Sequence, residues 1–218
     1  MTAPVTPQSL TSVLLQLSAA GLADLNQLWG LSPSELAVAL FDILPGLVDT
    51  WAEASAAAAA DWYDELRDQK EISGKFNAIV EPLGDLGAYD LAGWAVQALS
   101  LPEPDVLSAK WRIEDGFQKS LVNAANLTVT GSAAEDPNAK GYMRRTRPGA
   151  CKFCIMVASN GAIYTKKSAT FACHGHCYCE AVPAWGGEPI PVKPYKPAQR
   201  PQTAKQKARV KKWIADNL

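Results

Sequence analysis

The sequence predicts a mostly α-helical protein with an N-terminal helical module, a small zinc-stabilised α+β module near the C-terminus, and an extended basic tail. Three observations lead to this expectation. Hydrophobic residues recur at helical spacing in the first half, all cysteines and histidines fall between Cys151 and Cys179, and prolines crowd the segment after residue 186. The expected division is a helical module at 1–127, a linker at 128–140, a Cys/His-rich module at 141–185 and a tail at 186–218.

The composition is that of an ordinary globular chain, with 48% hydrophobic residues, 20% charged residues and a net charge of −1. No apolar run reaches the roughly 18 residues that a membrane-spanning helix needs, and the first residues lack the pattern of a secretory signal. We therefore expect a soluble protein in a reducing compartment, where closely spaced cysteines are metal ligands more often than disulfides.

The small net charge conceals two halves of opposite sign. Residues 1–139 carry 19 acidic and 6 basic side chains, whereas residues 140–218 carry 3 acidic and 15 basic ones. Two explanations stay open, namely attraction between the two halves of one molecule, or a nucleic-acid or acidic-protein partner for the basic half.

Helix signals begin close to the N-terminus. Leucines at helical spacing predict a first helix near residues 7–28. The run Ser32-Pro33-Ser34-Glu35 has the pattern of a capping box and predicts the start of a second helix. We expect this helix to kink or restart at Pro45-Gly46 and to end near Ile72.

A further helical pair is predicted near residues 90–99 and 104–126, followed by a polar, turn-rich connection at 128–140. The large apolar side chains of the helices are the predicted core. The principal ones are Trp51, Trp62, Trp94, Trp111, Phe117 and Leu121.

The segment from Cys151 to Cys179 opens with Cys-x-x-Cys and closes with His-Gly-His-Cys-Tyr-Cys. Zinc prefers thiolate and imidazole ligands in tetrahedral geometry, and the first spacing presents two sulfurs to one ion. Short strands are expected at 161–164 and 180–182, in a module too small to be stable without a bound metal. The candidate metal ligands are Cys151, Cys154, His174, His176, Cys177 and Cys179.

The second half of the ligand set stays open. Alternation along an extended chain places Cys177 and Cys179 on one side, which would complete a four-cysteine site, whereas a turn at Gly175 would break the alternation. We expect a structural zinc ion held by Cys151, Cys154 and two of His174, Cys177 and Cys179, with His176 in reserve. The alternatives are a metal-free cluster of reduced thiols and a disulfide.

Enzymatic activity is not expected. Glu180 follows a cysteine and could act as a general base beside an open metal position, but a single glutamate is a weak signal. The sequence contains no H-E-x-x-H, no G-x-S-x-G and no glycine-rich phosphate loop.

The tail combines a proline-rich stretch with a short basic helix candidate at the C-terminus. Its charge and proline content prevent it from forming a core of its own, so we expect it to be extended and ordered only by a partner. The apolar side of the terminal helix would consist of Val210, Trp213, Ile214 and Leu218, with Trp213 as the anchor.

The stretch RRTRPGACKFCIMVASNGAIYTKK…HGHCYCEAVPAW resembles the C-terminal domain of MuF-like minor head proteins of tailed bacteriophages. The helical segment EASAAAAADWYDELRD is similar to the N-terminal region of the versions from phages of actinobacteria. Cys173 is an extra cysteine that departs from the motif. The matching motif positions are Cys151, Cys154, Gly161, His174, Cys177, Cys179, Val182 and Pro183.

The resemblance implies a minor capsid protein with a structural role in head morphogenesis and in DNA packaging or ejection. It implies a location at the portal vertex or in the capsid interior of the virion, and in the host cytoplasm during assembly. The implied partners are the portal protein, the major capsid protein or both, and several copies of the chain are expected in each particle. Packaged DNA is a further expected partner for the tail, and no membrane partner is expected. Two other functions stay open, a zinc-knuckle nucleic-acid-binding protein and a capsid maturation protease.

Overall fold

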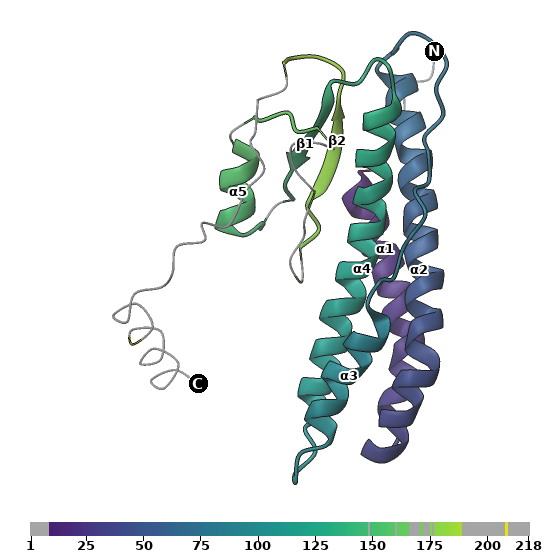
Figure 1. Cartoon of the computed structure of the whole chain (residues 1–218), viewed down its shortest axis with the longest axis vertical. Coiled ribbons are helices and arrows are strands. Elements are labelled where there is room, and N and C mark those ends of the chain that lie inside the picture. Colours follow the sequence, from purple (N-terminus) through teal and green to yellow (C-terminus); the bar gives the residue numbers. More distant parts are fainter. Residues whose placement is uncertain are drawn as a thin grey trace, which may run out of the picture.

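The computed structural model shows an elongated helical bundle with a two-stranded sheet and a short helix beside its upper part (Figure 1). The prediction of a mostly helical chain is therefore confirmed. Of the tail predicted at 186–218, only residues 186–188 and Ala208 are among the described residues. The structure describes residues 9–147, 149–159, 161–165, 171, 175, 177–188 and 208.

Helix α1 (Leu10–Leu25) begins the bundle and continues into the 3-10 helix η1 (Asn26–Gly30). The Ser9 hydroxyl accepts a hydrogen bond of 3.2 Å from the Ser12 N–H, which satisfies one of the free donors at the helix start. One face of the helix is buried against the rest of the bundle. Its buried residues are Leu10, Leu14, Ser18, Gly21 and Leu25.

Helix α2 (Pro33–Gln69) begins with the predicted capping box. The Ser32 N–H donates to the Glu35 carboxylate at 3.0 Å, and the Glu35 N–H donates to the Ser32 hydroxyl at 3.5 Å. The predicted restart at Pro45 is wrong, because the helix continues through it. A proline removes one helical hydrogen bond, and here the burial of neighbouring side chains outweighs that loss. These side chains are Leu40, Leu44 and Val48.

Helices α3 (Ala88–Leu99) and α4 (Val106–Glu135) complete the bundle. The turn-rich connection predicted at 128–140 is wrong for its first eight residues, because α4 runs through them. Their small side chains favour a turn locally, yet they let the helix pack closely, and a Cβ added at Gly131 would overlap Glu81. The division into two modules stays a prediction. The buried residues of this last part of α4 include Thr128, Val129, Ser132 and Ala133.

Two of the predicted core tryptophans lie on the surface. Trp94 is 41% exposed and Trp111 is 54% exposed, and their rings contact each other edge to face with centroids 6.3 Å apart. Phe117 and Leu121 are fully buried, as predicted. The difference arises because α3 turns small side chains inward, which brings its backbone close to its neighbours and leaves no room for an indole. These inward residues are Ala88, Ala92, Ala95 and Ala98.

The sheet consists of β1 (Gly141–Arg145) and β2 (Glu180–Ala184), which pair antiparallel with Arg145 opposite Glu180. The prediction of a strand beginning at Glu180 is confirmed, whereas β1 falls where no strand was predicted. The strand predicted at 161–164 is reduced to one isolated bridge between Tyr142 and Tyr164.

Two large hydrophobic clusters and a small third one lie in the interior of the described part of the chain. The lower of the two large clusters lies among α1, η1, α2, α3 and α4. The upper one joins α1, α2 and α4 to the sheet and to the cysteines, so the cysteine region shares a core with the bundle. Its members include Leu10, Leu14, Trp62, Tyr63, Val122, Tyr142, Cys154, Cys177, Cys179 and Ala181.

A buried carboxylate fastens the end of the sheet to the bundle. Asp136, at the end of α4, accepts hydrogen bonds from the Tyr63 hydroxyl at 3.1 Å and from Arg67 Nε at 3.2 Å. Trp185 follows β2 directly, and its indole N–H donates to the same carboxylate at 2.9 Å. Burying a charge is costly unless it is paired and hydrogen-bonded, and this arrangement meets both conditions.

None of the helices in the described part of the chain combines the length and the apolar character needed to cross a bilayer.

Candidate metal centre

The first arm of the cysteine cluster is the start of a short helix. Helix α5 (Lys152–Ser159) begins after Cys151, and the Ile155 N–H donates to the Cys151 carbonyl at 3.0 Å. The Cys154 N–H donates to the Cys151 sulfur at 3.4 Å, in the place where a serine hydroxyl would cap a helix. The Cys-x-x-Cys spacing therefore forms a helical turn with Cys154 pointing inward, since Cys154 is 1% exposed.

The second arm is the extended segment that leads into β2. Cys177 and Cys179 are both buried, and the intervening Tyr178 is only partly buried. Both cysteine sulfurs lie close to Cys154, so the two side chains project to the same side, as alternation along an extended chain requires. The first turn of α5 and the segment before β2, which are separated in sequence, thus meet at one point.

The three sulfur atoms have the spacing of a metal site. Those of Cys154, Cys177 and Cys179 all lie within 4.8 Å of one another, and those of Cys154 and Cys177 are 3.7 Å apart. Two thiolates on one tetrahedral zinc ion, each about 2.3 Å from the metal, are about 3.8 Å apart. A disulfide would need about 2.05 Å, so these cysteines are not joined by disulfides, and their sulfur separation suits zinc.

The electrostatic environment favours the neutral thiols in the absence of a metal. Burial raises the pKa of Cys154 to about 11. A hydrogen bond with Cys177 and burial raise the pKa of Cys179 above its ordinary value. A metal would have to displace the protons, after which its charge would stabilise the thiolates. Buried thiols with raised pKa values are poor nucleophiles, which disfavours a catalytic cysteine.

The predicted ligands divide into three groups. Cys154, Cys177 and Cys179 come together, while Cys151 is exposed on the outer side of the first turn, one hydrogen bond away from Cys154. His174 and His176 lie outside the described residues, as does Cys173. The chemistry of the three buried sulfurs fits zinc, and a fourth ligand would complete the tetrahedron.

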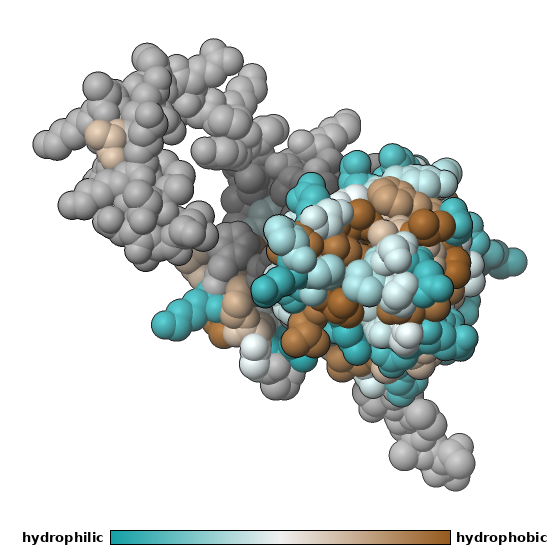
Figure 2. Space-filling view, turned by 90° about the horizontal axis from the view of Figure 1, so that it is seen from below, coloured by the Kyte–Doolittle hydropathy of each residue, from teal (hydrophilic) through white to brown (hydrophobic). Residues whose placement is uncertain are grey.

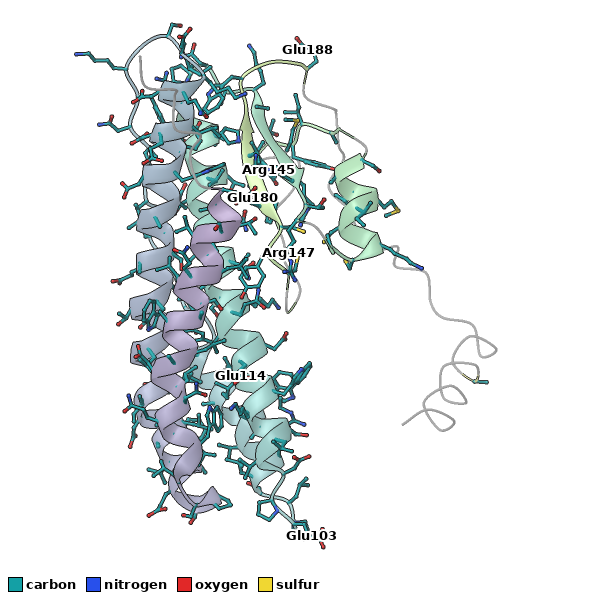
Figure 3. The ribbon with its side chains drawn as sticks, turned by 180° about the vertical axis from the view of Figure 1, so that it is seen from behind. Glu103, Glu114, Arg145, Arg147, Glu180 and Glu188 are labelled. Carbon is teal, nitrogen blue, oxygen red and sulfur yellow. The ribbon has the colours of Figure 1, made fainter. Side chains whose placement is uncertain are left out.

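Glu180, considered above as a general base, has a structural role. One of its carboxylate oxygens accepts a hydrogen bond of 2.9 Å from the Thr11 N–H at the start of α1. The other pairs with Arg145 on the neighbouring strand, and Figure 3 shows these two side chains where the sheet meets the bundle. Both oxygens are engaged and the residue is buried, so this carboxylate anchors β2 to α1.

Two residues of α4 that were not predicted from the sequence hold the second arm. Gln118 and Asn126 are 2% and 1% exposed, and their side-chain amides bond to the backbone of Cys177 and Cys179. Polar amides among the apolar residues of one helix face were the available signal, because such groups are seldom buried without a partner.

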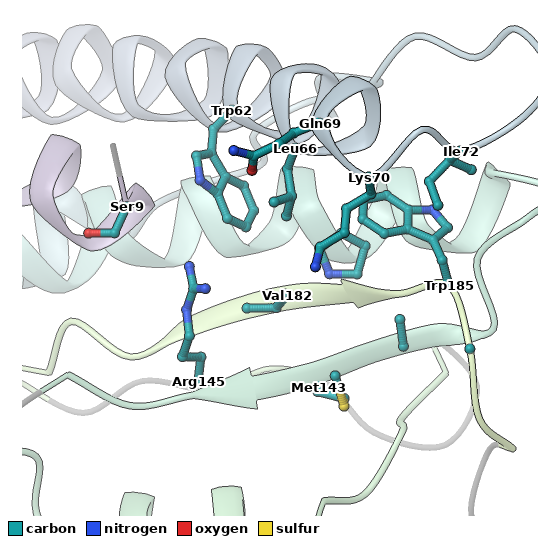
Figure 4. Close-up of a pocket in the computed structure, with 13 residues that line it drawn as sticks. Ser9, Trp62, Leu66, Gln69, Lys70, Ile72, Met143, Arg145, Val182 and Trp185 are labelled. Carbon is teal, nitrogen blue, oxygen red and sulfur yellow. The ribbon is translucent and has the colours of Figure 1, made fainter. Parts of the chain in front are cut away.

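A separate cavity of about 630 Å³ lies between α2 and the sheet. Figure 4 shows Trp62 and Leu66 of α2 and Arg145 of β1 around it. The Arg145 guanidinium lies 5.8 Å from the centre of the Trp62 ring, and Lys70 lies at the margin. The described lining residues provide apolar contact and the positive charges of Arg145 and Lys70.

Comparison with known families gave one finding. The model of the family described as VG15 protein matches residues 1–203, which include the bundle, the sheet and the cysteine cluster. Comparison with curated proteins and with solved structures gave no match.

Proposed function

This chain belongs to the VG15 protein family, a family of phage virion-associated proteins, and we propose that it is a minor capsid protein of the phage head. The observation that carries the proposal is the family match, which extends over both the bundle and the cysteine region. The resemblance of the cysteine segment to MuF-like minor head proteins supports the finer assignment to head morphogenesis, at the portal vertex or in the capsid interior.

The proposed role is structural. Helices α1 to α4 form a bundle whose sequence is strongly acidic, and some large apolar side chains lie on its surface. Figure 2 views the molecule from below, and hydrophobic residues reach the surface at several places on this end. Exposed apolar side chains among charged ones are typical of a surface that contacts another protein. They include Leu31, Leu101, Leu107 and Trp111.

The proposed partners are the portal protein, the major capsid protein or both, with several copies of the chain in each particle. Packaged DNA is a further proposed partner for the basic tail, and no membrane is involved. The protein would be present in the host cytoplasm during assembly and in the virion afterwards.

We further propose that the cysteine cluster holds a structural zinc ion. Cys154, Cys177 and Cys179 would supply three thiolates, and the fourth ligand would come from Cys151, His174 or His176. The spacing of the three buried sulfurs supports this assignment. Bound zinc would link α5 to the segment before β2 and so hold α5 beside the sheet and the bundle.

Purified virions provide the test of the head assignment. Heads and tails of disrupted particles are separated, and the protein is quantified in each by mass spectrometry, with the major capsid and tail tube proteins as markers. The expected result is co-purification with heads, in fewer copies than the major capsid protein. Recovery with tails, or absence from particles, would contradict the proposal.

The two rival functions predict different results. A capsid maturation protease would cleave the major capsid protein in a purified mixture. A nucleic-acid-binding protein would bind DNA with an affinity that falls steeply with salt. The proposed structural role predicts no cleavage by the purified chain.

A further inference from the structure

Among the described residues, the segment that carries Cys177 and Cys179 and leads into β2 has no strand partner on the side that faces helix α4. β1 pairs with one edge of β2, and the other edge lies against the helix. Exposed backbone groups of an extended segment must find other partners when they are buried. Two side chains of α4 provide these partners, and both bond to residues of the cysteine cluster or next to it.

The side chain of Asn126 makes hydrogen bonds of the kind that a neighbouring strand would make. Its amide nitrogen donates to the Cys179 carbonyl at 3.2 Å, and its amide oxygen accepts from the Ala181 N–H at 2.5 Å. The carbonyl of one residue and the N–H of the residue two positions later lie on the same edge of an extended chain, and one carboxamide can donate to the first and accept from the second. The Asn126 amide nitrogen also donates to the Val122 carbonyl of its own helix at 2.8 Å. Asn126 therefore fixes the backbone on both sides of Glu180.

Gln118 holds the other cysteine of the segment. Its amide nitrogen donates to the Cys177 carbonyl at 3.1 Å, and both groups are buried. The Gln118 side-chain oxygen has no hydrogen-bond partner among the residues that the structure describes. A buried oxygen without a hydrogen-bond partner costs folding free energy. The bond from Gln118 to the Cys177 carbonyl is therefore the interaction that we take to explain a glutamine at this position.

A third residue of the same helix, Asp115, also lies against this part of the chain. A Cβ added at Gly175 would overlap the Asp115 carboxylate, so the chain approaches α4 here as closely as a glycine allows. Asp115, Gln118 and Asn126 follow one another at spacings of three and eight, which places them along one side of the helix. Gly175 and residues 177–181 thus lie along α4.

We propose that Gln118 and Asn126 are positioning residues of the metal site, so that helix α4 of the bundle sets the metal affinity of the cysteine cluster. They hold the backbone of Cys177 and Cys179 where the two sulfurs meet Cys154, so the ligands are arranged before the metal binds. This inference rests on the proposed zinc site. It predicts that the metal site is coupled to the bundle and is not an independent knuckle.

The test measures zinc dissociation constants of the full chain by competition with a chromophoric chelator. Gln118→Met keeps the volume and removes the donor, and Asn126→Leu removes both partner groups. Asn123→Ala, on the same helix, is the matched control, since no hydrogen bond joins its side-chain oxygen to the described part of the cysteine segment. Thermal unfolding of the metal-free proteins is measured in parallel.

Zinc affinity should fall about tenfold or more in Gln118→Met and Asn126→Leu, the loss typical of removing supporting hydrogen bonds around a metal site. The control should bind zinc like the unaltered protein. The cobalt-substituted variants should also show altered absorption bands, which a change in bundle stability alone would not cause.

Unchanged zinc affinity in Gln118→Met would overturn the inference while leaving the zinc site intact, and this variant decides if Asn126→Leu does not fold. An equal loss of affinity in Asn123→Ala would also overturn it. Absence of zinc from the unaltered protein would instead refute the proposed metal site, and the positioning role with it.

Discussion

The sulfur atoms of Cys154 and Cys177 lie 3.7 Å apart, although the two residues are 23 positions apart in the chain. This contact connects the first turn of α5 with the segment before β2. Because Cys179 lies close to both, three thiols from two arms converge at a buried point of the core shared with the bundle.

The first prediction concerns metal content. Purified protein should contain close to one zinc ion per chain, and Cys154→Ser or Cys177→Ser should reduce this to near zero, because each removes a buried thiolate. Elemental analysis of protein never exposed to a chelator is the measurement. Met156→Ser, at an exposed position of α5, should keep its zinc. Unaltered protein that contains no zinc would contradict the prediction.

The second prediction concerns Trp62, which was predicted to be buried and is only 4% exposed. Trp62→Ala should lower the free energy of unfolding by about 3–5 kcal/mol, since it leaves a large cavity in the upper core. Urea titration followed by circular dichroism is the measurement. Trp111→Ala, at a position that is 54% exposed, serves as the control and should cost far less. Equal losses in the two variants would argue against the packing described for Trp62.

The third prediction concerns the pH dependence of stability. Burial would raise the pKa of Asp136, but hydrogen bonds from Trp185, from the Asn138 N–H, from Arg67 and from Tyr63 outweigh it and lower the pKa below its usual value. The stability that Asp136 contributes is therefore fully present above the unfolded pKa of about 3.9, and it is lost as the pH falls through the folded pKa.

Asp136→Asn should accordingly remove part of the loss of stability in acid. At neutral pH it should lower the free energy of unfolding by about 3–5 kcal/mol, because the buried Arg67 loses its counter-charge. Urea titrations between neutral and acidic pH test both statements, with Asp61→Asn on the exposed face of α2 as the control. A variant that matches the unaltered protein at every pH would refute the role given to this carboxylate.

The fourth prediction concerns the tail. Residues 186–218 carry eight basic and two acidic side chains, so they should act through a partner with negative charge. Deleting residues 199–218 should leave folding and zinc content unchanged and reduce incorporation into phage heads. The amount of truncated protein in purified particles is the measurement. A normal amount would mean that the helical bundle, and not the tail, is the docking element.

Features that depend on neighbouring residues could be predicted from the sequence alone. The capping box at Ser32 and Glu35 marked the start of α2, because its bonds form within one helical turn. The Cys-x-x-Cys spacing and the return arm identified the metal-site candidates, since ligand spacing is a local property. The family resemblance likewise rested on a contiguous motif, and the VG15 match supports a phage virion protein without reaching the finer assignment.

The tertiary structure, through long-range packing, determines which surfaces are buried and which distant groups meet. It extended α4 through Gly131, because close packing of small residues outweighs their local preference for turns. It left Trp94 and Trp111 exposed, because alanines bring α3 too close for an indole to be buried. It also placed Gln118 and Asn126 against the cysteine segment. Backbone groups without a strand partner need hydrogen bonds, and no local pattern reveals which distant amides provide them.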